Sequence, residues 1–373
     1  MRSRKGRLGI MVTRSSHIPP FGNQRFYRTL CTIGHKQGLL VFVFSPEQID
    51  WSSGTVSGYS IGASAGRWSR KRYPLPDLIY DRCFFRTKTS YLAYRSHVRK
   101  LRRLRSVTFL GHGLHGKRQV HDILSGDGDI ARYLPQTRLF DSLPELKRWL
   151  SERGQLFMKP QGGSQGRNVL HIRAAPFGPY PIVVKGRNAG NRLFRCGFTS
   201  TMQLYRWLKE RTAGRRYMMQ PYLELTTSAG EPFDIRSFVQ KNKDGRWQLI
   251  GMAMRKGKPG SLTSNLHGGG HAEQVWPFLQ EHYGEKAADI MENMQALSMR
   301  IAETLEREHG RLVELGIDLG IDKSGELWIL EANSKPGRTI FLHTQDKPAR
   351  RLAISNPIHY ACYLWGRQPG GLS

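Results

Sequence analysis

The chain has 373 residues, of which 39% are hydrophobic and 10% aromatic, so it is long and apolar enough for two or three domains with proper cores and is not a disordered chain. No apolar run approaches the roughly 20 residues that a membrane-spanning helix needs, and the basic amino terminus has too short an apolar stretch for a signal peptide. Its 58 lysines and arginines outnumber 29 acidic residues, which gives a formal net charge of +29. The sequence therefore predicts a basic globular protein of the cytoplasm.

The positive charge is concentrated in clusters along the chain, at residues 67–72, 95–105, 185–195 and 206–216. A field of this kind favours polyanionic partners such as nucleic acid, an acidic polymer or an anionic protein. No helix-turn-helix, zinc-finger or ribonucleoprotein motif accompanies the charge, so a dedicated nucleic-acid role is disfavoured. A basic surface with no single partner is the alternative. The four cysteines lie far apart and form no C-x-x-C pair, which predicts neither disulfides nor a zinc site.

The first third of the chain has the pattern of a parallel α/β domain. Apolar runs at 8–12 and 39–44 flank an amphipathic stretch at 24–36, which predicts a strand, a helix and a second strand. The Ser- and Gly-rich residues 50–66 predict a hairpin or loop. Further expected elements are strands at 75–80 and 107–110 and a very basic helix between them, at 88–104. We expect this domain to span residues 1–114.

Residues 111–118, GHGLHGKR, nearly fit the P-loop pattern G-x-x-x-x-G-K-[S/T] between a strand and a helix. The last position fails, because Arg118 has no hydroxyl group to hold Mg²⁺. A P-loop nucleoside triphosphatase is therefore disfavoured. Lys117 is kept as a candidate, since a lysine at the start of a helix can reach a phosphate.

A second unit, expected over residues 115–216, contains a glycine-rich loop. A helix at 143–153 and a strand at 155–160 precede the loop, and a helix at 201–210 closes the unit. Glycines let backbone N–H groups approach phosphate oxygens closely, and Lys159 supplies a point charge beside them. The candidate phosphate-binding residues of this loop are Gly162, Gly163, Ser164, Gln165 and Gly166.

A third unit, expected over residues 217–345, begins with an apolar strand at 217–223 that could form the wall of a pocket for a flat purine ring. Strands follow at 233–239 and 249–255, and alternation along the first of them places Asp234 and Arg236 on one face. His267 and His271 could form a metal pair, but the glycines between them exclude the helix that aligns such ligands in zinc motifs. A long amphipathic helix is expected at 287–309, and residues 346–373 form a tail expected to pack on the amino-terminal domain.

Residues 312–337 carry the strongest candidate for a metal site. Strands at 312–322 and 326–333, joined by the turn 322–325, place Glu331 and Asn333 on one face. If the turn pairs its end residues, Asp318 lies opposite Ile329 and diagonal to Glu331, on that same face. Two carboxylates and an amide oxygen are the hard ligands that Mg²⁺ prefers, and Mn²⁺ is an alternative. The competing interpretation is a half-buried hairpin whose polar residues face water.

Taken together, these motifs resemble the ATP-grasp superfamily. The resemblance rests on their order, which is Lys117, Lys159-Pro160, the 161–166 loop, the QPYL strand, Asp234-Ile235-Arg236, Arg255, SNLHGGG, GID and E-A-N-x-x-P. Residues 220–337 are similar to the RimK-type glutamate ligases. The whole chain most resembles the YheC/YheD group of endospore coat-associated ATP-grasp proteins, and the motifs cover residues 117–337.

The resemblance implies an ATP-grasp fold, in which two α+β lobes hold ATP and an amino-terminal α/β domain precedes them. By motif match, Lys117 and Lys159 contact phosphates, and Arg255 and Asn265 lie on the phosphate side, with Arg255 and Lys159 as catalytic residues. Asp234 lies near the ribose or the acceptor. The remaining assignments are Gln220, Pro221, Tyr222 and Leu223 at the adenine and Asp318, Glu331 and Asn333 at magnesium.

The chemistry that this resemblance implies is the activation of a carboxylate by ATP and Mg²⁺ through an acyl phosphate, followed by attack of an amine. The spread of basic clusters suggests a small-molecule or peptide carboxylate that is itself polyanionic, such as an acidic peptide or polymer. An association with the spore coat follows from the group's name. The alternatives are an ATP-binding spore structural protein without turnover and a polyanion-binding protein.

Overall fold

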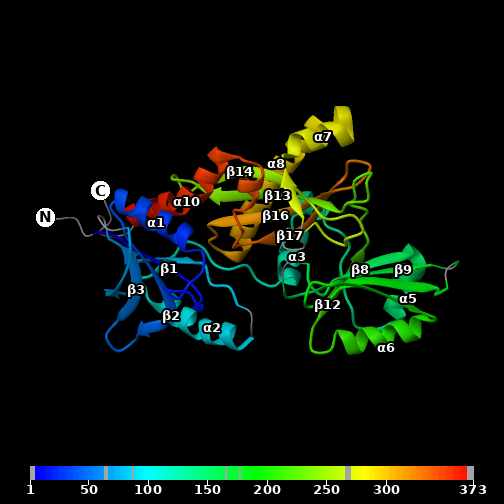
Figure 1. Ribbon diagram of the computed structural model, residues 1–373, viewed down its shortest axis with the longest axis horizontal. Helices are drawn as coiled ribbons and strands as arrows, with labels where there is room; N and C mark the ends of the chain where they lie inside the picture. The colour runs from blue at the N-terminus through cyan, green and yellow to red at the C-terminus, as the bar shows by residue number, and fades with distance from the viewer. Residues whose placement is uncertain are drawn as a thin grey trace.

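Three β-sheets organise the chain (Figure 1). The computed structural model describes residues 5–62, 66–85, 88–163, 166–175, 177, 179–264 and 270–367. One sheet belongs to the amino-terminal domain, one to a central lobe and one to a carboxy-terminal lobe that lies between the other two (Figure 1). None of the helices in the described residues combines the length and the apolar character needed to cross a bilayer.

The amino-terminal sheet has the strand order β4-β3-β2-β1-β5-β6. Strand β1 pairs in parallel with β2 and β5, and β5 pairs in parallel with β6, so the predicted parallel α/β domain is confirmed. Alternate side chains of β1 enter two different cores, one beneath α1 and α10 and the other beneath α2. The strands and helices are β1 (Arg7–Met11), α1 (Gln24–Lys36), β2 (Leu40–Asp50), β3 (Thr55–Ile61), β4 (Trp68–Pro74), β5 (Leu78–Asp81), α2 (Lys88–Arg103) and β6 (Thr108–Phe109).

Strand β4 is not anticipated by the sequence pattern. The described part of the predicted hairpin or loop at 50–66 does join β2 to an antiparallel β3, but β4 adds a further antiparallel strand outside this hairpin. Its sequence WSRKRYP exposes Arg70, Lys71 and Arg72, so it lacks the apolar run from which strands are usually predicted. Charged side chains on an edge strand are a common protection against pairing with other chains.

The central sheet is antiparallel, with the order β11-β10-β9-β8-β12-β7. One face is covered by α5 and α6, which pack on Leu156, Met158 and Met219. Phe157 and Lys159 alternate with the core residues of β8 and therefore point to the opposite face. The elements are β7 (Arg138–Leu139), α5 (Leu143–Arg153), β8 (Gln155–Pro160), β9 (Leu170–Ala174), β10 (Ile182–Arg187), β11 (Leu193–Phe198), α6 (Thr201–Arg211) and β12 (Tyr217–Pro221).

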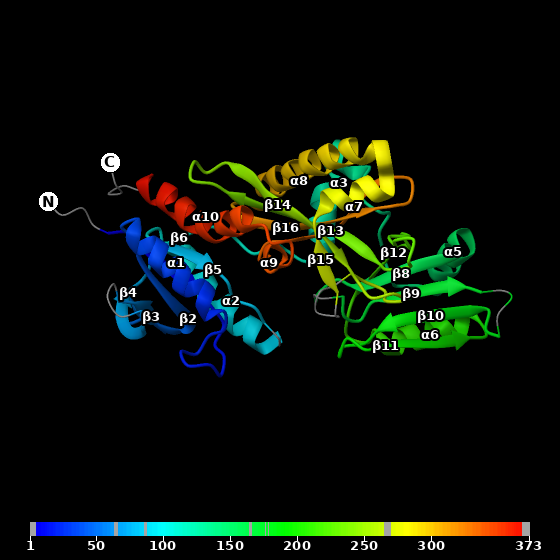
Figure 2. The same cartoon turned by 45° about the horizontal axis from the view of Figure 1, so that its top comes forward.

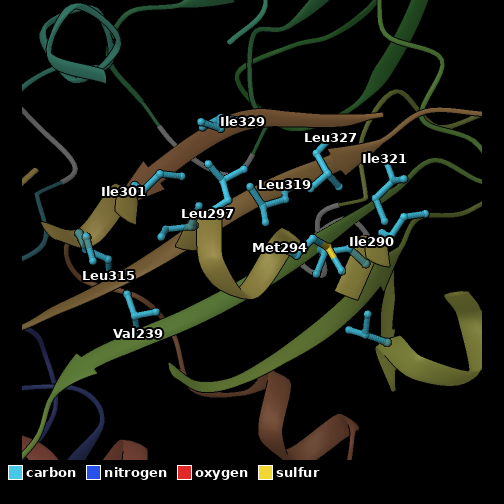
Figure 3. Packing of buried hydrophobic residues seen from close by; sticks show 14 of the residues in the cluster. Val239, Ile290, Met294, Leu297, Ile301, Leu315, Leu319, Ile321, Leu327 and Ile329 are labelled. Atoms are coloured by element: carbon cyan, nitrogen blue, oxygen red, sulfur yellow. The ribbon is translucent and has the colours of Figure 1, made fainter. Parts of the chain in front are cut away.

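The carboxy-terminal sheet has the antiparallel order β15-β14-β13-β16-β17. Helix α8 covers one face, and Figure 3 shows Met294, Leu297 and Ile301 of this helix packed among side chains of the strands. The opposite face carries polar residues such as Asp234 and Asp318 together with a smaller apolar cluster around Phe238 and Phe341. The elements are β13 (Phe233–Lys241), β14 (Trp247–Lys256), β15 (His271–Glu273), α7 (Val275–Tyr283), a 3₁₀ turn (Gly284–Lys286), α8 (Ala287–His309), β16 (Glu314–Ile321), β17 (Leu327–Asn333) and α9 (Ile340–His343).

Two short helices within residues 115–216, the range expected for the central lobe, pack elsewhere. Val120 and Leu124 of α3 (Lys117–Ser125) and Ile130 of α4 (Gly128–Ala131) belong to the core beneath α8. Asp127 reinforces this contact, because it accepts hydrogen bonds from Arg300 at 2.9 Å and from the hydroxyl of Thr304 at 2.9 Å. The segment that follows residue 115 is therefore fixed to the carboxy-terminal lobe by packing, although the four-part division of the chain stays a proposal.

Helix α10 (Lys347–Gly366) connects the carboxy-terminal lobe to the amino-terminal domain (Figure 2). Ala349 and Ala353 pack beside Phe238 and Phe341 of the carboxy-terminal lobe. The later turns contribute Ile358, Ala361 and Trp365, among others, to the core beneath α1. The tail thus packs on the amino-terminal domain and, in addition, on the sheet of the neighbouring lobe.

A buried carboxylate joins the same two parts of the molecule. Glu314 of β16 accepts hydrogen bonds from Tyr80 Oη at 2.7 Å and from Arg82 Nη1 at 2.6 Å, both at the end of β5. Gln240 Nε2 of β13 donates at 2.9 Å, and Arg338 donates through Nη2. Burial raises the pKa of Glu314, but the charges of Arg338 and Arg82 and these hydrogen bonds outweigh burial and hold the pKa below its usual range. Glu314 is therefore ionised and fully satisfied.

We expect Glu314→Gln to lower the free energy of unfolding by about 3–5 kcal/mol, because the change leaves two buried guanidinium groups without their anion. Urea unfolding at pH 7 measures the effect. Glu292→Gln is the matched control, since Glu292 is exposed on α8 and should change stability by less than about 0.5 kcal/mol.

The same variant should also change the response to acid. A carboxyl whose folded pKa is depressed stabilises the protein above its unfolded pKa of about 4.3, and the stabilisation is lost as the pH falls through the folded pKa. The wild-type protein should therefore lose stability below about pH 4.3 more steeply than Glu314→Gln. If the free energy of unfolding falls equally steeply with decreasing pH in the two proteins, Glu314 is not the titrating group.

Candidate functional site

A cavity of ≈ 2190 Å³ opens between the central and carboxy-terminal sheets and extends to helix α2 of the amino-terminal domain. Side chains from all three sheets or their helices line it, for example Lys159 of β8, Asp234 of β13 and Tyr91 of α2. Every candidate site residue in the part of the chain that the structure describes lies along this cavity. Ser164, Gln165, Asn265 and His267 lie outside the described residues. The structure thus brings the candidates together, while their individual roles stay predictions.

The two candidate metal carboxylates are direct neighbours across the sheet. Asp318 of β16 pairs with Glu331 of β17 and not with Ile329. The predicted register is therefore wrong at this position, because a bulge interrupts the pairing. The pairing shifts after Asp318, because β17 contains one extra residue, Leu330, before Ile329 meets Leu319. Residues directly opposite in antiparallel strands share a face, so the bulge brings the two acids closer than the diagonal arrangement expected from the turn.

Asp318 is held between two arginines. Arg236 donates to both carboxylate oxygens, at 3.0 Å from Nη2 to Oδ2 and by a shorter contact from Nε, and Arg255 Nη2 lies 3.0 Å from Oδ2. Burial raises the pKa of Asp318, but the charges of Arg236 and Arg255 prevail and hold the pKa below its ordinary range. The site therefore contains an ionised buried carboxylate.

Arg255, a predicted catalytic residue, is itself clamped by acids. Its guanidinium donates to both oxygens of Asp234, at 2.6 Å from Nε and 2.7 Å from Nη2, in addition to its contact with Asp318. Burial lowers the pKa of Arg255, and the two aspartates raise it by more. Ser264 donates to the same Asp234. The pair Asp234–Arg255 is thus a fixed part of the wall, in which Arg255 keeps its charge.

Two lysines from different elements meet strand β17 at the carboxylate pair. Lys117 begins α3, and its Nζ lies 3.2 Å from Glu331 Oε2. Lys159 Nζ donates to the carbonyl oxygen of Leu330 at 3.1 Å. Burial, together with the nearby charge of Lys117, lowers the pKa of Lys159 to about 8. Both amines therefore lie beside the two acids, and Lys159 titrates close to physiological pH.

The structure does not support the P-loop interpretation of residues 111–118. The backbone N–H of His112 donates to the carbonyl of Arg311 at 2.9 Å, and a Cβ on Gly111 would lie 2.6 Å from the backbone nitrogen of Val313. This segment therefore packs along the start of β16 and does not wrap around a phosphate. Arg118 lies on the surface and pairs with Asp122 one turn later in α3.

The described glycines of the 161–166 loop line the cavity beside Lys159. Gly163 and Gly166 have φ values of 111° and 62°, which only glycine adopts without strain. Among the described residues, no side-chain or backbone atom lies within 4 Å of a Cβ placed on Gly162 or Gly163, so packing against these residues does not require glycine. An open backbone of this kind suits the close approach of a ligand.

The predicted adenine wall forms one side of the same cavity. Gln220, Pro221, Tyr222 and Leu223 all line it. Tyr222 stacks on His171 of β9, with ring centroids 3.7 Å apart and planes within 10°. Gln220 is buried and donates to the hydroxyl of Thr137 at 2.8 Å, so its side-chain amide is engaged within the lobe.

The donor set at β16 and β17 fits a hard divalent cation. Asp318, Glu331 and Asn333 lie on one face of two paired strands and line the cavity with oxygen atoms. No three His, Cys, Asp or Glu side chains gather as a metal site within the described residues, so an ion here would depend on the Asn333 amide, water or a phosphate for its further ligands. Mg²⁺ is bound in this way in phosphate-transfer sites. His271 instead contacts Glu273 at 2.6 Å.

Sequence reasoning missed two cations of the site. Arg236 was noticed for sharing a face with Asp234 but was not assigned a role, and it proves to bind Asp318. Lys335 lines the cavity two residues after Asn333 and lies 2.8 Å from Asp81 of the amino-terminal domain. The alternation D-I-R on β13 could have indicated Arg236, whereas no local pattern indicates the partner of Lys335.

Comparison with known proteins agrees with this arrangement. Residues 106–364 match the family described as YheC/D like ATP-grasp. The chain is 26% identical over 331 residues to the endospore coat-associated protein YheC of Bacillus subtilis (strain 168), covering 89% of this chain and 90% of YheC. It is also 26% identical over 342 residues to the endospore coat-associated protein YheD of the same strain, covering 91% of this chain and 74% of YheD.

Solved structures show the same fold at low sequence identity. The D-cycloserine synthetase DcsG superposes with a TM-score of 0.54 and 13% identity over 93% of this chain and 98% of that chain. The ATP-grasp ligase PsnB complexed with a minimal precursor superposes with a TM-score of 0.53 and 13% identity, over 94% of this chain and 99% of that chain. These likenesses confirm the predicted ATP-grasp fold, and the family match covers more than half of the chain. The chain therefore belongs to the YheC/D like ATP-grasp family.

Proposed function

We propose that this protein is an ATP- and Mg²⁺-dependent ligase that joins a carboxylate to an amine through an acyl phosphate. The observation that carries the proposal is the meeting of Lys117 and Lys159 with the Asp318–Glu331 pair in one cavity. Family membership supports it, and so does the shared fold of the ligase PsnB in its complex with a minimal precursor, Mg and ADP, at a TM-score of 0.50.

The nucleotide would occupy the cavity with its base against residues 220–223 and its phosphates beneath the glycine-rich loop. Lys117 and Lys159 would bind phosphate oxygens, and Asn265, which lies outside the described residues, is a further candidate contact by motif match. Asp318, Glu331 and Asn333 would hold Mg²⁺ or Mn²⁺, which would neutralise phosphate charge when bound. Fixed cations of this kind act by positioning and by electrostatic stabilisation.

In the reaction, a carboxylate oxygen of the substrate attacks the γ-phosphorus in line, and the bond to the β–γ bridging oxygen breaks to release ADP. An amine then attacks the acyl carbon, and inorganic phosphate leaves with the bonding electrons. Lys159 and Arg255 serve as catalytic residues by stabilising the negative charge that both steps concentrate. Because Arg255 is anchored by Asp234, its charge stays in place throughout the reaction.

No side-chain nucleophile takes part in this scheme. Cys83 lines the cavity, but burial and the neighbouring charge of Asp81 raise the pKa of its thiol well above the usual value. A thiol held in its protonated form is a poor nucleophile. Direct transfer through an acyl phosphate agrees with that environment.

The charge of the protein favours an acidic peptide or polymer as the carboxylate substrate over a free amino acid. The relatives YheC and YheD are named as endospore coat-associated proteins, which suggests that this protein also acts at the spore coat. An anionic partner there would be compatible with the net charge of +29. The alternative is an ATP-binding structural protein of the spore without turnover.

We expect millimolar Mg-ATP to raise the melting temperature of the wild-type protein, because a ligand of the native state stabilises it by mass action. Glu331→Gln and Lys159→Ala should each weaken nucleotide binding about tenfold, or about 1.4 kcal/mol, by removing a contact on either side of the phosphates. Arg118→Ser is the control, since Arg118 is only partly buried, does not line the cavity and pairs only with Asp122 among the described acids. The nucleotide site is refuted if the wild-type protein gives no thermal shift.

Nucleotide affinity should also fall as the pH rises from 7 to 9. Lys159 binds phosphate as a cation and, with a pKa of about 8, loses its proton over this interval. Calorimetric titration should show a loss of about tenfold, as expected when roughly nine-tenths of the amine is neutral at pH 9. Lys159→Arg keeps its charge and should give a nearly flat profile. An equal loss in both proteins would assign the titration to another group.

Turnover is tested by measuring ADP release in a screen of amino acids and acidic peptides. ADP should appear only with a carboxylate substrate, and hydroxylamine should trap the acyl phosphate as a hydroxamate detectable by mass spectrometry. Glu331→Gln should abolish both signals. Nucleotide binding with no carboxylate-dependent ADP release across the screen would favour the structural alternative.

A further inference from the structure

Helix α2 presents a row of arginines to the cavity. Arg95, Arg99 and Arg102 are spaced i, i+4 and i+7, so they form one stripe along the helix. All three are exposed and line the cavity that contains the carboxylate pair. Leu101, on another side of the helix, is fully buried against the amino-terminal sheet, which fixes the direction of the stripe. In both views α2 lies on the side of its domain nearest the central lobe (Figure 1, Figure 2).

The arginines of α2 differ from the cations at the nucleotide end in having no internal anion. Lys117 pairs with Glu331, and Arg236 pairs with Asp318. Among the described residues, no carboxylate lies within ion-pair distance of the three arginines of α2, and the only acids that line the cavity are Asp234, Asp318 and Glu331. The α2 end of the cavity therefore carries uncompensated positive charge.

The central lobe adds further positive charge to the cavity. Arg167, Arg215 and Arg216 of the central lobe line the same cavity, and no ion pair joins any of them to an acid of the described residues. Low-dielectric walls of one sign focus the field between them, which raises the local concentration of anions. The cavity thus has a paired nucleotide end and an open cationic arm.

Aromatic side chains lie between the cations of the arm. Phe84 is 51% exposed and Tyr91 is 43% exposed, and both rings line the cavity. Arg82 stacks 5.2 Å from the ring centroid of Phe84, and Arg95 lies 5.7 Å from that of Tyr91. Such a surface can contact both the methylene groups and the charged ends of acidic side chains.

The arm is firmly connected to the strand that carries the metal ligands. Asp81 accepts a hydrogen bond from Tyr94 of α2 and forms an ion pair with Lys335 at 2.8 Å. Lys335 also donates to the carbonyl of Cys83 at 2.9 Å. Since Lys335 follows Asn333 by two residues, the α2 wall has a set position relative to the carboxylate pair.

We propose that the α2 arm binds an extended acidic polypeptide and delivers one of its carboxylates to the nucleotide end. Four residues of helix rise about 6 Å, close to the roughly 6.8 Å between alternate residues of an extended chain, so Arg95 and Arg99 match carboxylates on one side of such a chain. A polypeptide is favoured over a nucleic acid because the ligase reaction, on which this assignment of substrate rests, consumes a carboxylate. The binding itself needs no ATP.

The test is fluorescence anisotropy with a labelled ten-residue polyglutamate peptide, without nucleotide, in 50 mM salt. Arg95→Gln/Arg99→Gln should bind the peptide at least tenfold more weakly than the wild-type protein. Arg102 is left unchanged because it donates to His112 Nδ1 at 3.0 Å. Lys71→Gln/Arg72→Gln removes the same charge from the exposed strand β4, away from the cavity, and should change the affinity less than twofold. Glutamine forms helix about as well as arginine, and circular dichroism checks that both proteins remain folded.

Two further probes separate the alternatives. A polyglutamine peptide of equal length should not bind, and a single-stranded oligonucleotide should bind more weakly than polyglutamate. Tighter binding of the oligonucleotide through the same arginines, or an equal loss of affinity in the Lys71/Arg72 control, would overturn the proposal. Peptide binding that depends on Arg95 and Arg99 would support the arm as a peptide-binding site even if no peptide supports ADP release. ADP release with a free amino acid but no peptide binding would support the ligase function and contradict the role proposed for the arm.

Discussion

The placement of the amino-terminal domain depends on one buried carboxylate, Glu314. Its cost of burial is compensated only when Arg82 from the amino-terminal domain, Arg338 from the loop after β17 and the neutral donors are all in place. If any donor is removed, part of the buried charge of Glu314 is compensated neither by the protein nor by water. Partial docking of the amino-terminal domain is therefore unfavourable. Glu314 also precedes Asp318 by four residues on the same strand, which places both acids on the same face. The contact between domains and the candidate active site therefore share one rigid element.

That face of the carboxy-terminal sheet is a layer of ion pairs. Arg236 and Arg255 come from β13 and β14, and they meet Asp318 and Asp234 at distances typical of charge-assisted hydrogen bonds. Because helix α8 covers the other face with an apolar core, the polar layer has a stiff support. Charges fixed in this way need little reorganisation when a substrate brings further charge, which is the property expected of an electrostatic catalyst.

The sequence predicts the elements of this protein better than their contacts. The helices at 24–36, 143–153 and 287–309 agree with the structure residue for residue, because an apolar stripe with polar ends leaves few alternatives. Strand β4 is not predicted because its arginines and lysine interrupt the alternation of apolar and polar residues. The register predicted at Asp318 is wrong because a bulge has no local sequence signature. The clustering of candidates around one cavity followed from motif order. The pairing of Arg255 with Asp318 did not, since these residues are far apart in sequence and meet only through the strand order β14-β13-β16.

The distribution of charge suggests where substrate selection resides in this fold. At the nucleotide end each acid that lines the cavity already has a cationic partner, so a further anion there competes with an internal acid for Lys117, Arg236 or Arg255. The arginines of α2 and of the central lobe lack such partners in the described residues, so a ligand anion there gains attraction without displacing an internal acid. Under the proposed function, binding energy that distinguishes one carboxylate from another would therefore come from the arm outside the nucleotide site. Asp81 links α2 to Lys335, two residues after the end of β17, so under the proposed function the amino-terminal domain would form part of the ligase site.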